Sequence, residues 1–89
     1  MPVEVTVQPT PNPDAMKFTL DRPVVEGRSQ SYNSPQEAET SPLAKRLFAV
    51  QGVAGLFMTA NFVTVRRGPG MEWEEIVRQV EAALKAHFG

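Results

Sequence analysis

Residues 53–67, VAGLFMTANFVTVRR, hold two β-rich runs that are separated by a two-residue turn. The turn is Ala60-Asn61, and Asn is one of the few residues that tolerates the positive φ of tight hairpin turns. The stretch therefore predicts an antiparallel hairpin with strands over residues 53–59 and 62–67. Side chains alternate between the two faces of a strand, so one of two sets faces the core: Phe62, Thr64 and Arg66, or Val63, Val65 and Arg67.

The residues before this hairpin predict two more strands. Valines occupy every second position over residues 3–8, which is the period of a half-buried strand. Three prolines over residues 9–13 remove backbone donors and favour extended conformations, so they end this strand in a stiff connector. Alternating apolar residues over 16–20 indicate a second strand that pairs with the first, and residues 21–27 indicate a loop. Residues 29–32 hold one aromatic among polar residues and indicate at most a short edge strand.

Helix-start signals occur on both sides of the hairpin. Residues 34–37, SPQE, fit a capping box, in which Ser caps the helix and Glu reaches back to the open backbone amide, and they predict a short helical turn. Ser41-Pro42 repeats the cap-and-proline start before an apolar helix face, which Gly52 ends as a left-handed cap. A last amphipathic helix follows the breaker Gly68-Pro69-Gly70, with acidic residues in its first turn and basic residues in its last.

These elements follow the order β-β-α-β-β-α. We expect an α+β domain of two layers, with a four-stranded, mostly antiparallel sheet and both helices packed on one face. Eighty-nine residues support a single hydrophobic core, so residues 1–89 are expected to form one domain. The start at Met1 and the helical end His87-Phe88-Gly89 are typical of natural chain ends, and a fragment of a longer protein stays an open alternative.

Composition excludes several functional classes. Nine basic against ten acidic residues give a net charge of −1, so we expect neither a nucleic-acid partner nor a membrane partner. The chain has no Cys, which removes disulfides, thiol nucleophiles and cysteine-ligated iron–sulfur clusters. No apolar stretch approaches the roughly 18 residues of a membrane span, and the N-terminus has no secretory pattern. The expected protein is soluble, cytoplasmic and monomeric.

Candidate catalytic and metal-ligating residues are few. His87 is the only imidazole and lies in the last turn of the final predicted helix, and no nucleophile or orienting partner is marked for it. Glu72, Glu74 and Glu75 open the same helix, where the helix dipole and solubility explain them. Gly68-Pro69-Gly70 lacks the spacing and the Lys of a phosphate-binding P-loop. We expect no enzyme, no metal site and no resident cofactor in this chain.

Two surfaces are candidates for binding a partner. The Pro-rich loop is rigid and presents Thr10, Asn12 and Asp14 at little entropic cost, although an ordinary turn explains the same residues. Arg66 and Arg67 end a strand that the pattern indicates as edge-prone, where charges either discourage sheet aggregation or dock a partner. Four aromatic side chains are expected in the core rather than on a binding surface: Phe48, Phe57, Phe62 and Trp73.

Short motifs occur in a fixed order along the chain. They are T-P-N-P at 10–13, M-K-F at 16–18, S-P-L-A at 41–44, L-F at 47–48, G-V at 52–53, F-V-T-V at 62–65 and Trp73 at the start of the last helix. Any one of them is weak, but the ordered set spans nearly the entire chain. As a set, the motifs resemble the N-terminal domain family of Nfu-type, NifU-like iron–sulfur cluster scaffold proteins.

The resemblance implies an α+β domain that usually precedes a separate domain, whose Cys-x-x-Cys pair holds a [4Fe-4S] cluster for delivery to client enzymes. This sequence has no such pair, and thiolates are the ligands that the cluster requires, so we expect the cluster only on a partner. The implied role is accessory. We expect a non-catalytic interaction module that acts in trans with a Cys-x-x-Cys scaffold or with a client apoprotein.

Two other functional classes stay open. A small enzyme or ligand-binding domain would use the Pro-rich loop and Gly68-Pro69-Gly70 as walls of a shallow pocket of about 300 Å³ or more. An adaptor unconnected with iron–sulfur proteins would differ from the interaction module only in the identity of its partner.

Overall fold

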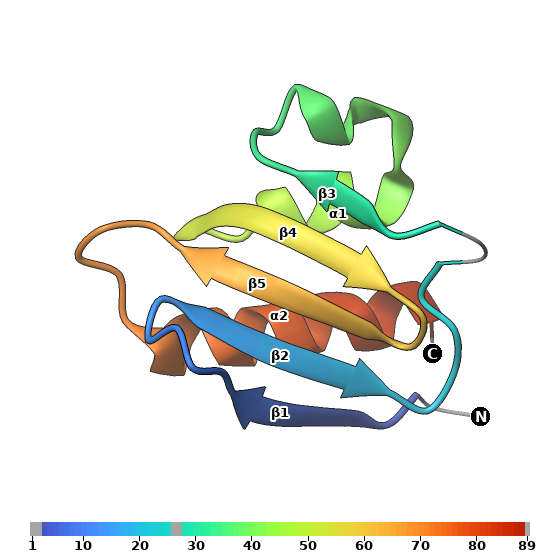
Figure 1. Cartoon of the computed structure of the whole chain (residues 1–89), viewed down its shortest axis with the longest axis horizontal. Helices are drawn as coiled ribbons and strands as arrows, with labels where there is room; N and C mark the ends of the chain where they lie inside the picture. The colour runs from blue at the N-terminus through green and yellow to red at the C-terminus, as the bar shows by residue number, and fades with distance from the viewer. Residues whose placement is uncertain (1–2, 26–27, 89) are drawn as a thin grey trace.

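The computed structural model describes residues 3–25 and 28–88, so residues 26–27 of the predicted loop lie outside the described residues. Figure 1 shows the strands in front and α2 running behind them. The elements follow in this order: β1 (Val5–Pro9), β2 (Ala15–Leu20), β3 (Gln30–Tyr32), the 3₁₀ helix η1 (Glu37–Thr40), α1 (Pro42–Phe48), β4 (Val53–Thr59), β5 (Phe62–Arg67) and α2 (Trp73–Phe88).

The sheet contains five antiparallel strands in the order β1-β2-β5-β4-β3, so the prediction of four strands is wrong. The additional strand is β3, in which Tyr32 reaches the core while Gln30 and Ser31 are exposed. A three-residue strand with one inward side chain has almost no periodic signal, because its pairing with β4 decides its conformation. The observed order is β-β-β-α-β-β-α, with η1 before α1.

The hairpin of β4 and β5 is confirmed, with Thr59 paired to Phe62. The residue with positive φ in its turn is Ala60, at 50°, and not Asn61. Asn61 instead ties the turn to β2, because its carbonyl accepts from Leu20 N at 2.8 Å and its side-chain amide donates to the Leu20 carbonyl at 3.2 Å. The expectation that β5 is edge-prone is wrong, because β5 lies between β2 and β4.

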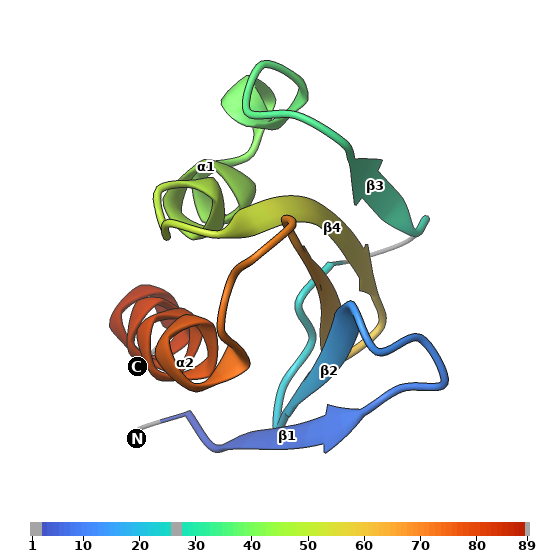
Figure 2. The same ribbon diagram turned by 90° about the vertical axis from the view of Figure 1, so that its left-hand side faces the viewer.

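Both helices cover one face of the sheet, as predicted, and the sheet curls around α2 (Figure 2). The core forms between these layers, where α2 packs on β1 and α1, and α1 packs on β4. Val63 and Val65 are the inward residues of β5, which settles the choice left open by the sequence. The largest fully buried side chains come from both layers: Phe18, Leu47, Met58, Val63, Val65, Ile76, Val80 and Leu84.

The start of α1 is confirmed, and so is the short helical turn that the sequence predicts before it, which forms as η1. Ser41 Oγ accepts from Ala44 N at 3.2 Å, and Pro42 occupies the first helical position. At the earlier signal, Glu37 N donates to Ser34 Oγ at 3.4 Å, and this hydroxyl donates to the Glu37 carboxylate at 3.3 Å. The Glu37 side chain therefore does not reach the backbone amide, and the segment closes as the short η1.

Gly52 adopts the positive φ that the sequence predicts, at 101°. It does not cap α1 directly, because α1 ends at Phe48 and Gly52 lies in the turn before β4. The turn is tight: a Cβ on Gly52 would lie 3.0 Å from both Ile76 Cδ1 and Met71 Cε. Gly52 thus lets β4 start close to the first turn of α2.

Candidate functional site

The loop between β1 and β2 is held in shape by its own polar side chains. The Thr10 hydroxyl accepts from Asn12 N at 3.1 Å and donates to the carbonyls of Asn12 and Ala15, at 2.8 and 3.0 Å. The Asn12 side-chain carbonyl accepts from Asp14 N at 2.9 Å, which closes an Asx turn. These side chains therefore stabilise the loop, as the ordinary-turn interpretation expects.

Arg67 ties this loop to β5 and to the start of α2. Its backbone amide donates to the Asp14 carbonyl at 2.9 Å, and its Nε donates to the Asp14 carboxylate at 3.1 Å. Its Nη1 donates to the Met71 carbonyl at 3.1 Å, and its Cζ lies 5.4 Å from the centre of the Trp73 ring. The indole Nε1 of Trp73 donates to the Pro13 carbonyl at 3.0 Å. We call these residues the loop cluster: residues 10–14, Arg67 and Trp73.

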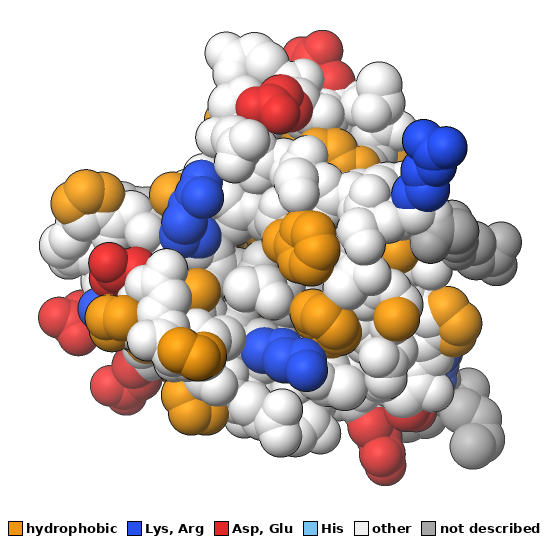
Figure 3. All heavy atoms as spheres, viewed as in Figure 1, with side chains coloured by type: hydrophobic (Ala, Val, Ile, Leu, Met, Phe, Trp, Pro, Cys, Tyr) orange, Lys and Arg blue, Asp and Glu red, His pale blue; other side chains and the backbone are white. Residues whose placement is uncertain are grey.

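The sheet face opposite the helices is exposed, and Figure 3 views it directly. Hydrophobic side chains lie over β4 and β5 in the middle of this view, and acidic side chains lie toward its periphery. Strand register and alternation place twelve described residues on this face, which we call the open face: Thr6, Gln8, Ala15, Lys17, Thr19, Ser31, Gly55, Phe57, Thr59, Phe62, Thr64 and Arg66.

Arg66 belongs to the open face, although it is adjacent in sequence to Arg67 of the loop cluster. Its Nη2 donates to the Asn33 side-chain carbonyl at 3.4 Å. Its guanidinium lies across Gly55, where a Cβ would come within 2.5 Å of Nη2 and 2.8 Å of Cζ. The missing side chain at Gly55 therefore leaves the space in which the guanidinium rests.

Two aromatic side chains and a lysine lie on the open face near Arg66. Phe57 is 40% exposed, so the expectation that it lies in the core is wrong. Its neighbours Leu56 and Met58 are buried, and alternation along β4 turns Phe57 outward. Phe62 is half-buried on the same face and is not part of the core, so the expectation for this ring is wrong as well. Lys17 Nζ lies 4.3 Å from the centre of its ring. The sequence does not reveal this alternation, because residues 56–58 of β4 are all apolar.

The five residues predicted to bind a partner divide between two surfaces. Thr10, Asn12, Asp14 and Arg67 meet in the loop cluster, whereas Arg66 lies on the open face. Trp73 also lies in the loop cluster, although its place in an apolar helix pattern predicts a core ring. Nothing local connects Trp73 with the loop, since 60 residues separate it from Pro13.

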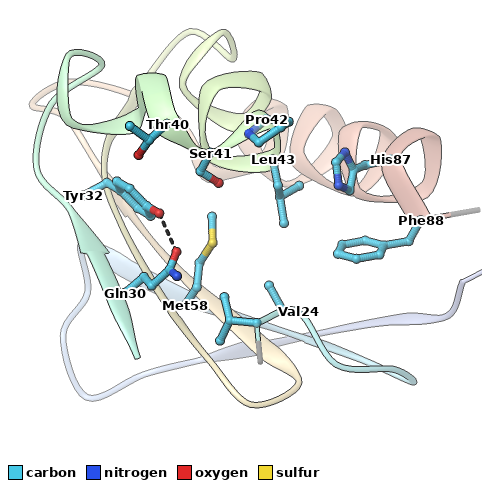
Figure 4. Close-up of a pocket in the computed structure, with 11 residues that line it drawn as sticks. Val24, Gln30, Tyr32, Thr40, Ser41, Pro42, Leu43, Met58, His87 and Phe88 are labelled. Carbon is cyan, nitrogen blue, oxygen red and sulfur yellow. Dashed lines mark hydrogen bonds between the residues drawn. The ribbon is translucent and has the colours of Figure 1, made fainter. Parts of the chain in front are cut away.

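A cavity of about 360 Å³ opens between β3, the start of α1 and the end of α2 (Figure 4). Gln30 and Tyr32 line one side, where the Tyr32 hydroxyl donates to the Gln30 side-chain carbonyl, and His87 lies on the opposite side. His87 packs edge-on against Phe88, with the ring centres 4.9 Å apart. Ser41 also lines the cavity, but its hydroxyl caps α1. Among the described residues, no hydrogen bond joins His87 to a hydroxyl nucleophile.

Three further cavities lie elsewhere on the surface. Their volumes are about 400, 150 and 360 Å³, near η1, on the open face and beside the β4–β5 turn. Within residues 3–25 and 28–88, none of these four cavities is lined by residues 10–14 or 68–70. The two predicted walls of the ligand-binding hypothesis therefore do not enclose any of them.

Two carboxylates away from both surfaces have lowered pKa values. A hydrogen bond from Arg22 holds the pKa of the Asp21 carboxyl below its usual value. Hydrogen bonds from Gln79 and then Arg78 lower the pKa of Glu75 in the same way. Over the described part of the chain, no three His, Cys, Asp or Glu side chains gather as metal ligands, and no helix has the length and apolarity of a membrane span.

Comparison with known sequences finds a family model and curated relatives that match nearly the whole chain. The family described as scaffold protein Nfu/NifU N terminal matches residues 5–89. The NFU1 iron-sulfur cluster scaffold homolog, mitochondrial, of Drosophila erecta is 43% identical over 86 residues, and that of Homo sapiens is 33% identical over 85 residues. Each match covers 94% of this chain but only 30% and 34% of these relatives. The chain thus spans about a third of the length of these curated relatives.

Solved structures with the same fold include two of similar size. The crystal structure of protein SAV1430 from Staphylococcus aureus has a TM-score of 0.79 at 26% identity, and covers 94% of this chain and 99% of that chain. The solution structure of a NifU-like protein from Saccharomyces cerevisiae has a TM-score of 0.83 at 22% identity, and covers 99% and 82%. The second likeness concerns the fold alone, and both agree with the α+β class expected from the sequence.

Proposed function

Because this chain belongs to the Nfu/NifU N-terminal scaffold family, we propose that it is a non-catalytic protein-interaction module in iron–sulfur cluster assembly or delivery. It acts in trans on a cluster-carrying protein, either a Cys-x-x-Cys NifU-like scaffold or a client apoprotein. The observation that carries the proposal is a family match over residues 5–89 in a sequence without cysteine. Iron–sulfur clusters are held by thiolates, so the cluster belongs on the partner.

The loop cluster and the open face are the two candidate contact surfaces for this partner. In the loop cluster, the side chains of Thr10 and Asn12 hold the backbone, while the Asp14 side chain is 62% exposed on a rigid loop. On the open face, Arg66 presents a guanidinium to solvent. Rigid, preordered surfaces of this kind lose little entropy when a partner binds, which supports a docking role.

The module acts without catalysis of its own. A general base needs a nucleophile within hydrogen-bond reach, and the one His of the sequence packs on Phe88 and lines the cavity in Figure 4. Among the described residues, the two carboxylates with shifted pKa values have lowered values, whereas a general acid at neutral pH needs a raised pKa. These features support binding rather than chemistry.

The chain is proposed to act as a monomer in the cytoplasm. The names of the curated relatives place those proteins in mitochondria, so the compartment of this chain stays a prediction. Fractionation of the cells that produce it, followed by immunodetection, tests the compartment. Light scattering behind a sizing column tests the oligomeric state, for which a mass of 9.8 kDa is expected.

A chemical-shift titration tests the proposed function. The ¹⁵N-labelled chain is titrated with a Cys-x-x-Cys NifU-like domain from the same organism, once without cluster and once loaded. We expect saturable shifts that map to the loop cluster or the open face, with affinity in the micromolar range typical of transient complexes. Absence of shifts with this domain and with client apoproteins, at several hundred micromolar, would contradict the proposal.

A further inference from the structure

We propose that the open face is the docking surface, and that it binds an extended protein segment in which an apolar side chain is flanked by carboxylates. The proposal deepens the proposed function and rests on it in taking the ligand to be a protein. Three groups of the open face would contact this segment: the guanidinium of Arg66, the ammonium group of Lys17 and the exposed ring of Phe57.

The charges on the open face select a negatively charged ligand. Its twelve residues include Lys17 and Arg66 and no acidic residue, although the chain as a whole has ten acidic and nine basic residues. The three ion pairs of the described residues hold Arg22, Arg67 and Arg78, so neither cation of the open face is neutralised by a described carboxylate. Complementary charge on a partner would steer its approach to this face.

The Arg66 guanidinium is placed to accept a carboxylate. It lies over Gly55, and of its several donors only Nη2 has a described partner, the Asn33 side chain at 3.4 Å. A depression of about 150 Å³ adjoins it, with Thr64 and Phe57 among its lining residues. A guanidinium is a planar fork that matches the two oxygens of a carboxylate, so this depression suits one acidic side chain.

The apolar feature lies beside these charges. Phe57 is the one large apolar side chain that is exposed among the described residues. It pairs with Thr64, which in turn pairs with Lys17, so Phe57 and Lys17 lie on either side of Thr64. Arg66 is a diagonal neighbour of both, at a distance of about 7–8 Å. An extended segment places alternate residues about 7 Å apart on one face, which matches this spacing.

Nucleic acid fits these observations less well than an acidic peptide. Exposed aromatic rings on a sheet can stack bases, and Phe57 and Phe62 offer such rings. Tight binding of a phosphate backbone, however, normally uses about six to ten cationic contacts, and the open face supplies two. The net charge of −1 opposes a polyanion further.

The test is an NMR titration of the ¹⁵N-labelled 89-residue chain with the peptide acetyl-Asp-Ser-Leu-Ser-Asp-amide. In its extended form, this peptide places Leu between two carboxylates on one face. We expect saturable shifts at the amides of Phe57, Thr64 and Arg66. The uncharged analogue acetyl-Asn-Ser-Leu-Ser-Asn-amide should bind about fivefold more weakly, because each exposed ion pair contributes at most about 1 kcal/mol. Raising the salt concentration should weaken the charged peptide alone.

Three variants locate the binding site. Arg66→Gln and Lys17→Gln should each weaken the charged peptide about threefold, whereas the control Lys85→Gln, in the last turn of α2, should leave the affinity unchanged. All three should keep the wild-type melting temperature within a few degrees, which shows that they fold. Equal weakening by Lys85→Gln, or shifts confined to the loop cluster, would overturn the proposal.

Other occupants are outcomes of the same experiment. Stronger binding of a thymidine hexanucleotide at the same amides would overturn the acidic-peptide proposal in favour of nucleic acid. Open-face shifts that depend on protein concentration without peptide would assign the face to a second copy of this chain, and would overturn it as well. Peptide binding at the open face without binding of any cluster-carrying protein would leave this proposal standing and reject the proposed function.

Discussion

Arg66 and Arg67 are adjacent in sequence but lie in opposite surroundings. Arg67 is engaged by Asp14, by the Met71 carbonyl and by the ring of Trp73, and its side chain is 26% exposed. Arg66 is exposed and has a single described hydrogen-bond partner, at 3.4 Å. The sequence gives both the same charge, so the difference comes entirely from the alternation of side chains along β5. Arg67 therefore stabilises the fold, whereas the Arg66 guanidinium is accessible from solvent.

The same division applies to the whole sheet. Its covered face carries fully buried side chains such as Phe18 and Val65, whereas its open face carries Lys17, Phe57 and small hydroxyl residues. Residues on the covered face lose solvent on folding and contribute most of the stability. Residues on the open face contribute little to stability, so they are available for recognition. The predictions below measure this difference from its largest consequence to its smallest.

The largest effect is expected where one phenylalanine from each face is truncated. Phe18→Ala should lower the free energy of unfolding by about 3–5 kcal/mol, because Phe18 is fully buried and the variant leaves a cavity. Phe57→Ala should lower it by about 1 kcal/mol or less, since the ring makes mainly cross-strand contacts. Urea denaturation measures both, with Phe18→Leu as a milder variant in case Phe18→Ala does not fold. Equal losses of unfolding free energy in Phe18→Ala and Phe57→Ala would contradict the difference between the two faces.

The two arginines should differ less, but in the same sense. Arg67→Ala should lower the free energy of unfolding by about 1–2 kcal/mol, because it removes an exposed ion pair, a hydrogen bond to the Met71 carbonyl and a cation–π contact. Arg66→Ala should change it by less than about 0.5 kcal/mol. Thermal and urea unfolding of the pair provide the test. A larger loss for Arg66→Ala would reverse the roles assigned here.

The hydrogen bond between Trp73 of α2 and the loop can be removed while an aromatic ring is kept. Trp73→Phe keeps an apolar ring beside Arg67 but loses the hydrogen bond from Nε1 to the Pro13 carbonyl. The expected cost is about 0.5–1.5 kcal/mol. Amide hydrogen exchange should also become faster in residues 10–14 and stay unchanged in β4. Unchanged exchange in the loop would show that Trp73 does not hold it.

The smallest effect on stability sharpens the description of the open face. Gly55→Ala should change the free energy of unfolding by less than about 0.5 kcal/mol, because the added methyl group meets the flexible end of Arg66 rather than backbone. It should nevertheless displace the guanidinium and weaken the charged peptide about as much as Arg66→Gln does. Loss of stability without loss of peptide affinity would mean that the position of Arg66 over Gly55 is irrelevant to binding.

The local sequence pattern predicts those elements whose conformation depends mainly on nearby residues. The β4–β5 hairpin, the Ser41 cap and the helix after Gly70 follow from alternation, capping and helical spacing, and all three are present. The third strand is only weakly indicated by residues 29–32 and is left out of the predicted order, because Gln30–Tyr32 acquires its conformation from β4. The residue type of Asn61 favours a positive φ, but Ala60 adopts that conformation, and Asn61 is held by hydrogen bonds to Leu20 instead.

The candidate surfaces were only partly predictable. The composition of the Pro-rich loop marked Asp14, and the charge pair marked Arg66 and Arg67. No local signal joins Asp14 to Arg67 across 53 residues, and none distinguishes the two arginines. The face of β5 that is buried could be decided only by where the helices pack.

The most direct test of the central claim compares the affinities of Arg66→Ala and Arg67→Ala for the same Cys-x-x-Cys NifU-like domain. Isothermal titration calorimetry is performed at a temperature where circular dichroism shows both variants fully folded. If the open face binds the partner and the loop cluster maintains the fold, Arg66→Ala should bind about fivefold to tenfold more weakly, and Arg67→Ala should match the wild type. Wild-type affinity for Arg66→Ala together with a clear loss for Arg67→Ala would contradict this account.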